Sequence, residues 1–445
     1  MSEMQVAVLG LGITGLSCVN FLRQEGYQVS VFDTRETPPG EDKLSADVKL
    51  IKGPLNGLLL ANFPLIIASP GIALATPALQ FASRTGCEVI GDIELFARKL
   101  KTAPYRHAKL VTITGSNGKS TVTSLLGEMA LEADVNVAVG GNIGVPALDL
   151  LSPDVDLYIL ELSSFQLETT RSLDADIATI LNVSEDHLDR YDSYQHYVQA
   201  KQLIYKQCKK ALFNRDDLLT YPTTEDLPSI SFGFDSHLYG LINDSDQHVF
   251  LALNGKPLLA VSALKLSGKH NWMNALAAFA LGEAVSLDKD AMLRILQQYR
   301  GLTHRCEFVA EINGVRWIND SKATNIGATQ AALSGLSDTI QGNIHVILGG
   351  EGKGANFSEL TAVLQEIKGE IVCFGKDAQQ IALCNQRAKR VQNLDAAVEL
   401  IANSSQTGDL VILTPACASL DMYSNFMARG EHFKTLVRAL TTDIT

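Results

Sequence analysis

Residues 112–121 combine the residue types that bind a nucleoside triphosphate. The segment TITGSNGKST follows a short apolar run and precedes a helical pattern, TVTSLLGEMALEA. Glycines let backbone N–H groups turn toward an anion, and the start of a helix adds a favourable dipole. In such loops the lysine, here Lys119, neutralises phosphate charge, and the next hydroxyl, Ser120, binds Mg²⁺. The general pattern G-x-x-x-x-G-K-[ST] has glycine where this chain has Ile113. A glycine-rich turn that only caps a helix is therefore an alternative.

Further polar residues follow this loop along the chain. Glu161 ends the apolar run LYIL, a position from which a carboxylate beside a phosphate loop can hold Mg²⁺. His187 lies just after the run IATILNV, between Asp186 and Asp189, and Lys201 lies in the helical stretch YVQAKQLIYKQ. The ordinary alternatives are a surface carboxylate at a strand end, a capped turn at the histidine and a solvated helix lysine.

A second glycine-rich turn, Gly10–Gly15, has the spacing G-x-G-x-x-G between a strand pattern and a helical pattern. Asp33 closes the next strand, near the spacing at which an acidic residue meets a ribose hydroxyl. This geometry selects a diphosphate-bearing nucleotide and not nicotinamide in particular. Because the next block already has an ATP loop, we expect the first block to hold a second nucleotide-linked ligand. Glycines that serve only helix–strand packing are the alternative.

Strand-like and helix-like segments alternate along the whole chain, which predicts α/β layers with largely parallel sheets. We predict a Rossmann-like domain over residues 1–97, a central P-loop ATPase-like domain over 98–302 and a Rossmann-like α/β domain over 303–445. Apolar residues alternate from about 229 to 266, and Asn254-Gly255 is a hairpin signal, so the central domain is expected to carry a small antiparallel appendage. Three domains that each bring one ligand imply hinge motion near the two boundaries.

Composition restricts the class of protein. The chain has 445 residues, 46% hydrophobic and 19% charged, which is a globular balance in a chain too long for one core. A net charge of −12 argues against nucleic acid as a partner. The seven cysteines form no C-x-x-C pair and no zinc-ligand spacing, which suits a reducing compartment. No basic leader is visible, and prolines interrupt the most apolar stretch, so we expect a soluble cytoplasmic protein without membrane insertion.

Several sequence segments occur together in one order. They are GSNGKST, LELSSFQLE, NVSEDHLDRY, HNWMNALAA, HRCE, WINDSKATN and PACASLDMYSNFMARG. With the first glycine turn they extend over residues 10–433, and together they resemble the Mur ligase family, ATP-dependent amide-forming enzymes of bacterial cell-wall synthesis. The family's phosphate loop also lacks the first general glycine. The segments WINDSKATN and PACASLDMYSNFMARG are most similar to the members that add D-glutamate.

The resemblance implies three substrates and two Mg²⁺ ions. The substrates are ATP, UDP-N-acetylmuramoyl-L-alanine and D-glutamate, and the last two are joined through an acyl phosphate formed with ATP. The protein is expected to be a monomer. Lys201 matches the family's carbamylated lysine, whose formation needs a neutral amine and hence a depressed pKa. The expected catalytic residues are Lys119, Glu161, His187 and Lys201, and the expected metal ligands are Ser120, Glu161, His187 and carbamylated Lys201.

The resemblance also implies the binding residues of each substrate. ATP is expected at Gly115, Ser116, Asn117, Gly118, Lys119, Ser120, Thr121, Asn274, Arg305 and Asp320, with the last three at adenine, phosphate and ribose respectively. The UDP-linked substrate is expected at Thr14, Asp33, Thr34, Gly71, Asn142 and His187. D-glutamate is expected at Lys322, Thr324, Lys353, Ser419, Leu420 and Phe426, where cationic and hydroxyl groups suit a dicarboxylate.

Other functions remain open on the sequence. A related ligase with a different amino acid, or one that extends folate with glutamate, is the nearest rival. An NAD-dependent oxidoreductase built on Gly10–Gly15 and a non-catalytic nucleotide-gated module belong to other classes. Without the resemblance, the alternative for Lys322 and Lys353 is that they are ordinary surface charges. The alternative for Leu420 and Phe426 is that they are ordinary core residues.

Overall fold

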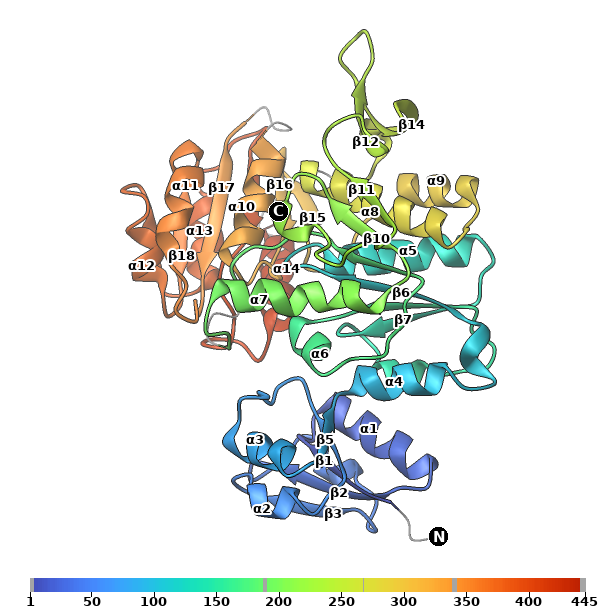
Figure 1. The fold of residues 1–445 in the computed structure, drawn as a ribbon. Coiled ribbons are helices and arrows are strands. Elements are labelled where there is room, and N and C mark those ends of the chain that lie inside the picture. Colours follow the sequence, from blue (N-terminus) through green and yellow to red (C-terminus); the bar gives the residue numbers. More distant parts are fainter. Residues whose placement is uncertain (1–3, 187–189, 267, 338–341, 441–445) are drawn as a thin grey trace.

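The computed structural model of the 445-residue chain describes residues 4–186, 190–266, 268–337 and 342–440. Three sheets follow one another along the chain, one in each of three α/β domains (Figure 1). The central domain is flanked by the other two, with the N-terminal domain below it and the C-terminal domain to its left in that view. The predicted fold class, three α/β domains with mostly parallel sheets, is confirmed.

The N-terminal domain holds a five-stranded parallel sheet in the order β3-β2-β1-β4-β5. Its strands are β1 (Gln5–Leu9), β2 (Gln28–Asp33), β3 (Lys49–Lys52), β4 (Leu65–Ala68) and β5 (Glu88–Ile90). Its helices are α1 (Ile13–Gln24), α2 (Gly57–Leu60), α3 (Pro77–Arg84) and α4 (Asp92–Leu100). The inner strands are apolar along their length because helices cover both faces. Strand order reverses between β1 and β4, the position at which ligands bind to sheets of this kind.

The central domain holds a nine-stranded sheet in the order β14-β13-β12-β11-β10-β9-β6-β8-β7. Its strands are β6 (Lys109–Thr114), β7 (Val137–Gly141), β8 (Leu157–Glu161), β9 (Ile177–Ile180), β10 (Ala211–Asn214), β11 (Ser229–Phe232), β12 (Tyr239–Asn243), β13 (Val249–Leu253) and β14 (Lys256–Ala260). Its helices are α5 (Lys119–Glu132), α6 (Ser164–Glu168), α7 (Tyr194–Gln202), α8 (Lys269–Ala284) and α9 (Lys289–Gln298). Helices α5 and α8 pack their apolar side chains into one core against this sheet.

The antiparallel appendage is smaller than predicted. Strand β11 pairs in parallel with β10 and with β12, so the antiparallel part comprises only β12, β13 and β14. Its start at residue 229 was therefore wrong, because β11 is an inner strand of the parallel sheet. The predicted turn is confirmed: Asn254 and Gly255 have φ values of 51° and 71°, and both residues of a two-residue hairpin turn of this kind need positive φ.

The C-terminal domain holds a six-stranded mixed sheet in the order β15-β16-β20-β17-β18-β19. Its strands are β15 (Glu307–Ile312), β16 (Val315–Asn319), β17 (Ile344–Gly349), β18 (Ile371–Phe374), β19 (Lys389–Arg390) and β20 (Leu410–Leu413). Its helices are α10 (Ile326–Ser337), α11 (Thr361–Glu366), α12 (Ala378–Ala382), α13 (Leu394–Ala402) and α14 (Phe426–Ala439). The antiparallel hairpin of β15 and β16 was not predicted, although Asn313-Gly314 at its turn is a hairpin signal.

Polar contacts from α1 and α4 join the N-terminal domain to the central domain. Ser17 Oγ donates to Asp149 Oδ1 at 2.6 Å, and Gln166 Nε2 donates to Asp92 Oδ2 at 3.0 Å. Burial raises the pKa of Asp92 to about 6.

No described helix combines the length and the hydropathy that a bilayer-spanning segment requires.

Candidate active site

The predicted site residues of the central domain gather at the carboxyl edge of its parallel strands. The phosphate loop leaves β6, which lies between β8 and β9 in the sheet. Glu161 is the last residue of β8, and the segment that contains Asp186 follows β9. Because the carboxyl ends of parallel strands meet at one edge, residues far apart in sequence become neighbours there. His187, another predicted site residue, lies outside the described residues.

The phosphate loop has the backbone that its sequence predicts. Gly118 precedes α5 with φ +81°, and a Cβ there would lie 2.5 Å from Asn274 Oδ1, so only glycine fits. Asn182 holds the loop from the end of β9: its Oδ1 accepts from Asn117 N at 2.8 Å, and its Nδ2 donates to Asn117 O at 3.0 Å. Sequence analysis did not identify Asn182, although a polar residue at the end of an apolar strand was a usable signal.

Two lysines converge on the loop. Lys119 Nζ donates to Gly115 O at 2.8 Å and to Ser116 O at 3.0 Å, while Lys201 Nζ donates to the same Gly115 oxygen at 2.9 Å. Lys201 lies on α7 with only 2% of its surface exposed, so it is not a solvated helix lysine. Burial, followed by the charge of Lys119, holds the pKa of Lys201 well below its usual range. Burial also lowers the pKa of Lys119.

A chain of hydrogen bonds surrounds Glu161, which is 3% exposed and not a surface residue. Ser120 Oγ donates to Glu161 Oε2 at 2.6 Å, and Asn142 Nδ2 donates to Oε1 at 2.8 Å. Arg305 Nη2 donates to Ser120 Oγ at 2.5 Å from the C-terminal side. A hydroxyl and a carboxylate oxygen held this close are ligands that suit Mg²⁺. The Ser120–Glu161 pair therefore fits the metal that the resemblance implies.

A cavity of about 400 Å³ adjoins the phosphate loop, with walls from the central and C-terminal domains. Residues predicted for ATP line it from both sides, namely Asn117, Gly118, Thr121, Asn274, Arg305 and Asp320. Asp320 is buried, and burial raises its pKa to about 7 although Cys306 N and Thr414 Oγ1 donate to it, each at 3.1 Å. The volume is in the range of small-molecule sites, and the apolar part of the wall suits a purine.

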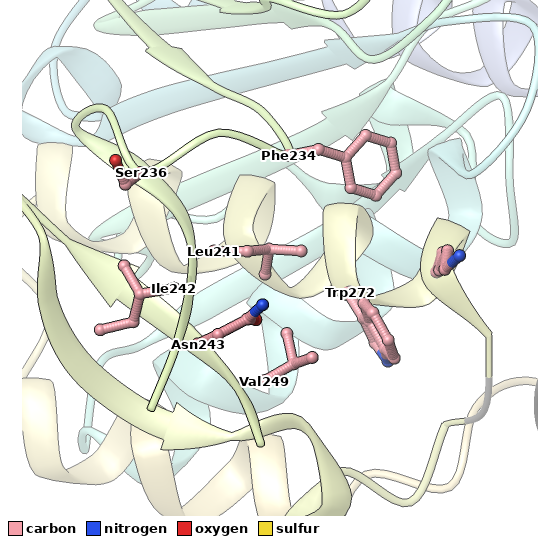
Figure 2. Close-up of a pocket in the computed structure, with 8 residues that line it drawn as sticks. Phe234, Ser236, Leu241, Ile242, Asn243, Val249 and Trp272 are labelled. Atoms are coloured by element: carbon pink, nitrogen blue, oxygen red, sulfur yellow. The ribbon is translucent and has the colours of Figure 1, made fainter. Parts of the chain in front are cut away.

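A second hollow, an open groove of about 720 Å³, shares Phe234 with this cavity (Figure 2). Leu241 and Val249 of the antiparallel appendage and Trp272 of α8 line it. Among the described residues, none of the predicted site residues lines it, and of its lining residues only Phe234 also lines the nucleotide cavity. Size alone therefore does not locate the chemistry.

The first glycine turn is built differently. Asp33 Oδ2 accepts from Leu11 N at 2.7 Å, and Arg35 pairs with the same carboxylate at 2.5 Å. Chiefly through the Arg35 hydrogen bond, the pKa of Asp33 is lowered to about 2. Gly15 has no room for a Cβ, which would lie 1.9 Å from Gly10 O.

The remaining residues predicted for the UDP-linked substrate lie in two domains. Thr14, Thr34 and Gly71 lie after β1, β2 and β4 at the carboxyl edge of the first sheet, whereas Asn142 lies in the central domain against Glu161. Arg190 of the central domain donates to Gly71 O at 3.0 Å, so the two domains touch at this edge.

Three loops of the C-terminal domain carry the residues predicted for D-glutamate. They follow β16, β17 and β20, which are neighbours in the sheet. Lys322 Nζ lies 4.1 Å from the centre of the Phe426 ring, and Lys322 also lines the nucleotide cavity. Burial, with Arg305 and Lys119 nearby, lowers the pKa of Lys322 to about 8, so it is not an ordinary surface charge.

The other predicted D-glutamate residues differ in exposure. Ser419 is buried, whereas Lys353 is exposed. Leu420 is 61% exposed, so it is not a core residue. Thr324 and Phe426 are half-buried.

Arg429 of α14 joins these three loops and was missed by sequence analysis. Its side chain is fully buried and donates to Ser321 O at 2.8 Å, Cys417 O at 3.0 Å and Gly349 O at 3.2 Å. A helical arginine gives no sign in the sequence of where its guanidinium points. Arg429 is identified only by its hydrogen bonds to the three loops in the folded structure.

Three protein-family models match the chain, one in each domain. Models of the Mur ligase MurD-like N-terminal domain, the Mur ligase middle domain and the Mur ligase glutamate ligase domain match residues 4–91, 113–282 and 304–417. A UDP-N-acetylmuramoylalanine–D-glutamate ligase of Aliivibrio salmonicida is 52% identical over 441 residues, 98% of each chain. The enzyme of the same name from Escherichia coli is 50% identical over 438 residues, again 98% of each chain.

Solved structures have the same fold. The UDP-N-acetylmuramate-alanine ligase of Thermotoga maritima gives a TM-score of 0.62 at 19% identity, covering 98% of this chain and 100% of the other. A pseudomurein peptide ligase type C from Methanothermus fervidus gives 0.59 at 17% identity, with the same coverage. Matched along its length by these domains and relatives, the chain belongs to the Mur ligase family.

Proposed function

We propose that this protein uses ATP to join D-glutamate to UDP-N-acetylmuramoyl-L-alanine in peptidoglycan precursor synthesis. The relatives at 52% and 50% identity carry this activity in their names. The observation that carries the proposal is the cation set at the phosphate loop, in which Lys119 lies on the loop while Arg305 and Lys322 line the adjoining cavity. In a chain of net charge −12, two anionic substrates can meet only where such cations are concentrated.

The first chemical step is a phosphoryl transfer. An oxygen of the alanyl carboxylate attacks the γ-phosphorus of ATP in line, an O–P bond forms, the bond to the β–γ bridging oxygen breaks, and ADP leaves an acyl phosphate. Lys119 and Arg305 offset the charge on the transferring oxygens. Asn274 and Asp320, which line the cavity, bind adenine and ribose.

Mg²⁺ is assigned to the oxygens around Glu161. Ser120 and Glu161 would hold one ion, and His187 with carbamylated Lys201 would hold a second. The short Ser120–Glu161 contact supports the first assignment, and Asn142 orients the second Glu161 oxygen. When bound, the ions supply electrostatic stabilisation of the transferring phosphoryl group.

Carbamylation of Lys201 is part of this proposal, and the surroundings of the side chain support it. Its neutral amine attacks CO₂, an N–C bond forms, a proton is released, and the side chain changes from a cation to an anion. The buried position and the charge of Lys119 favour the neutral amine that this reaction needs.

The second chemical step forms the amide. The free amine of D-glutamate attacks the acyl carbonyl, a C–N bond forms, the C–O bond to phosphate breaks, and phosphate leaves with loss of a proton from the amine. Lys322, Thr324, Lys353, Ser419, Leu420 and Phe426 are proposed to bind the amino acid. Because an acyl phosphate hydrolyses in water, the domains close before it forms.

The domain limits proposed from sequence are 1–97, 98–302 and 303–445. The first falls inside α4 and the second in the segment between α9 and β15, so we place the hinges at the ends of those elements. The seven free cysteines suit a reducing cytoplasm, where we propose that the protein acts as a monomer.

An amino-acid screen tests the proposed function. Phosphate release is measured with ATP, Mg²⁺ and UDP-N-acetylmuramoyl-L-alanine while D-glutamate, L-glutamate, L-alanine and diaminopimelate are supplied in turn. D-glutamate is expected to give at least about a hundredfold more phosphate than any other, because a site built for charged groups rejects misplaced ones strongly. Equal release with another amino acid would overturn the assignment.

A further inference from the structure

The segment His304–Cys306 links the central domain to the C-terminal domain. Arg305 N donates to Leu302 O at 3.3 Å on the central side of this link, and three other backbone hydrogen bonds of the segment reach the C-terminal domain. His304 N donates to Glu307 Oε2 at 2.8 Å, and His304 O accepts from Lys322 N at 3.0 Å. Cys306 N donates to Asp320 Oδ1 at 3.1 Å. These three partners belong to the C-terminal domain, so that domain holds most of the segment's backbone.

Arg305, between these anchors, reaches the other domain. Its guanidinium donates to Ser120 Oγ of the phosphate loop at 2.5 Å. The backbone on either side is in the left-handed region, with φ +64° at His304 and +45° at Cys306. Such conformations are unfavourable for residues with a Cβ and persist only where surrounding contacts hold them.

A partly buried ionic cluster supplies those contacts. Glu307 Oε2 also accepts from Asn319 Nδ2 at 3.0 Å, and Asn319 Nδ2 lies 2.9 Å from His304 Nδ1. Glu307 Oε1 pairs with Lys434 Nζ at 2.9 Å, and Lys434 is 8% exposed. Lys434 also pairs with Glu431 Oε1 at 3.0 Å.

Helix α14 approaches His304 too closely for any side chain at one position. A Cβ at Gly430 would lie 2.2 Å from His304 Nδ1. The imidazole is therefore fixed between α14 and the carboxylate of Glu307. None of the cluster residues lines the nucleotide cavity, whereas Arg305, the neighbour of His304, does.

We propose that Glu307 and Lys434 are positioning residues that fix the backbone of Arg305 to the C-terminal domain, so that domain closure delivers its guanidinium to the nucleotide phosphates. This rests on the phosphate role proposed above for Arg305. If Glu307 and Lys434 position Arg305 in this way, phosphoryl transfer depends on how the central and C-terminal domains are arranged.

The test is Lys434→Met, which removes the charge and keeps the length. We expect kcat to fall about tenfold, the factor produced when a charge-assisted hydrogen bond is lost, with KM for D-glutamate within twofold of wild type. Lys434→Arg is expected to restore most of kcat. The control Lys389→Met removes a pair with Glu370 (2.7 Å) elsewhere in the same domain and should leave kcat unchanged.

A double-variant cycle separates positioning from a merely structural role. If Lys434 acts through Arg305, Lys434→Met lowers kcat no further in an Arg305→Lys background. Multiplied effects, or a Lys434→Met enzyme with wild-type kcat, would overturn the proposal. If Lys434→Met fails to fold, Glu307→Gln gives the same measurement.

The single variant Arg305→Lys separates the proposed phosphate role of Arg305 from the positioning role of Glu307 and Lys434. Unchanged ATP turnover in this variant would remove the proposed phosphate role of Arg305 and the positioning proposal with it. A slow Arg305→Lys enzyme beside a normal Lys434→Met enzyme would remove only the positioning proposal.

Discussion

Two glycine-rich turns in this chain connect a parallel strand to a helix, yet their surroundings are opposite. The turn at Gly10–Gly15 faces an acid, Asp33, whose carboxylate accepts from a turn amide and pairs with Arg35. The phosphate loop is approached by Lys119 and Lys201 and, at Ser120, by Arg305. Two turns of similar sequence pattern therefore have surroundings of different charge.

The difference lies in charge and burial around the turns. An acid at the end of the second strand suits the hydroxyls of a ribose and repels a phosphate placed on it, whereas clustered cations suit a triphosphate. The glycines fix how closely a ligand can approach; the neighbouring side chains decide which chemistry follows. The predictions below test this division of roles.

Removing the phosphate-loop cation is expected to have the largest effect. Lys119→Ala should eliminate ATP-dependent phosphate release, a loss of at least about a thousandfold, because no other loop side chain can take its place on the transferring phosphate. Steady-state phosphate release measures it, with Lys206→Ala, an exposed lysine of the same domain, as the control. Retained turnover would mean that the loop is only a helix-capping turn.

Removing the second lysine sharpens the comparison by testing its charge state. Lys201→Ala should lower kcat by about a hundredfold or more, since an anionic metal ligand is lost, and added short carboxylic acids should restore part of it. Because the pKa of Lys201 is lowered, its amine is neutral over more of the working pH range than that of an ordinary lysine. Omission of CO₂ should therefore slow the wild type but not the variant. Full activity of Lys201→Ala would place this residue outside the reaction.

The smallest of these effects is expected at the acidic turn. Asp33→Asn should raise KM for the UDP-linked substrate about tenfold and leave KM for ATP unchanged, because one hydrogen-bonding charge is lost. The pKa of Asp33 is lowered to about 2, so the carboxylate contributes stability that is full above about pH 4 and is lost as the pH falls toward 2. Thermal melting at pH 3 and pH 7 should show a smaller pH effect in the variant. A rise in KM for ATP would contradict the separation of the two turns.

Local sequence signals predicted the elements well where the apolar pattern was continuous. The phosphate loop and helix α8 were found because each pattern is complete within a few residues. The hairpin of β15 and β16 was missed because its exposed edge strand has a weak apolar pattern. The predicted antiparallel appendage began too early in the chain because β11, an inner parallel strand, is short and partly polar.

The sequence by itself determined the three-domain α/β order, the two glycine turns and the family, since these depend on composition, on spacing within short segments and on motif order. Only the tertiary structure decided that Lys201 is buried beside Gly115, that Arg429 joins three loops and that Arg305, which follows the central domain in sequence, donates to Ser120 of the phosphate loop. Burial and contact between distant segments arise when strands pair at one sheet edge, and a helical pattern does not record which way a charged side chain will turn.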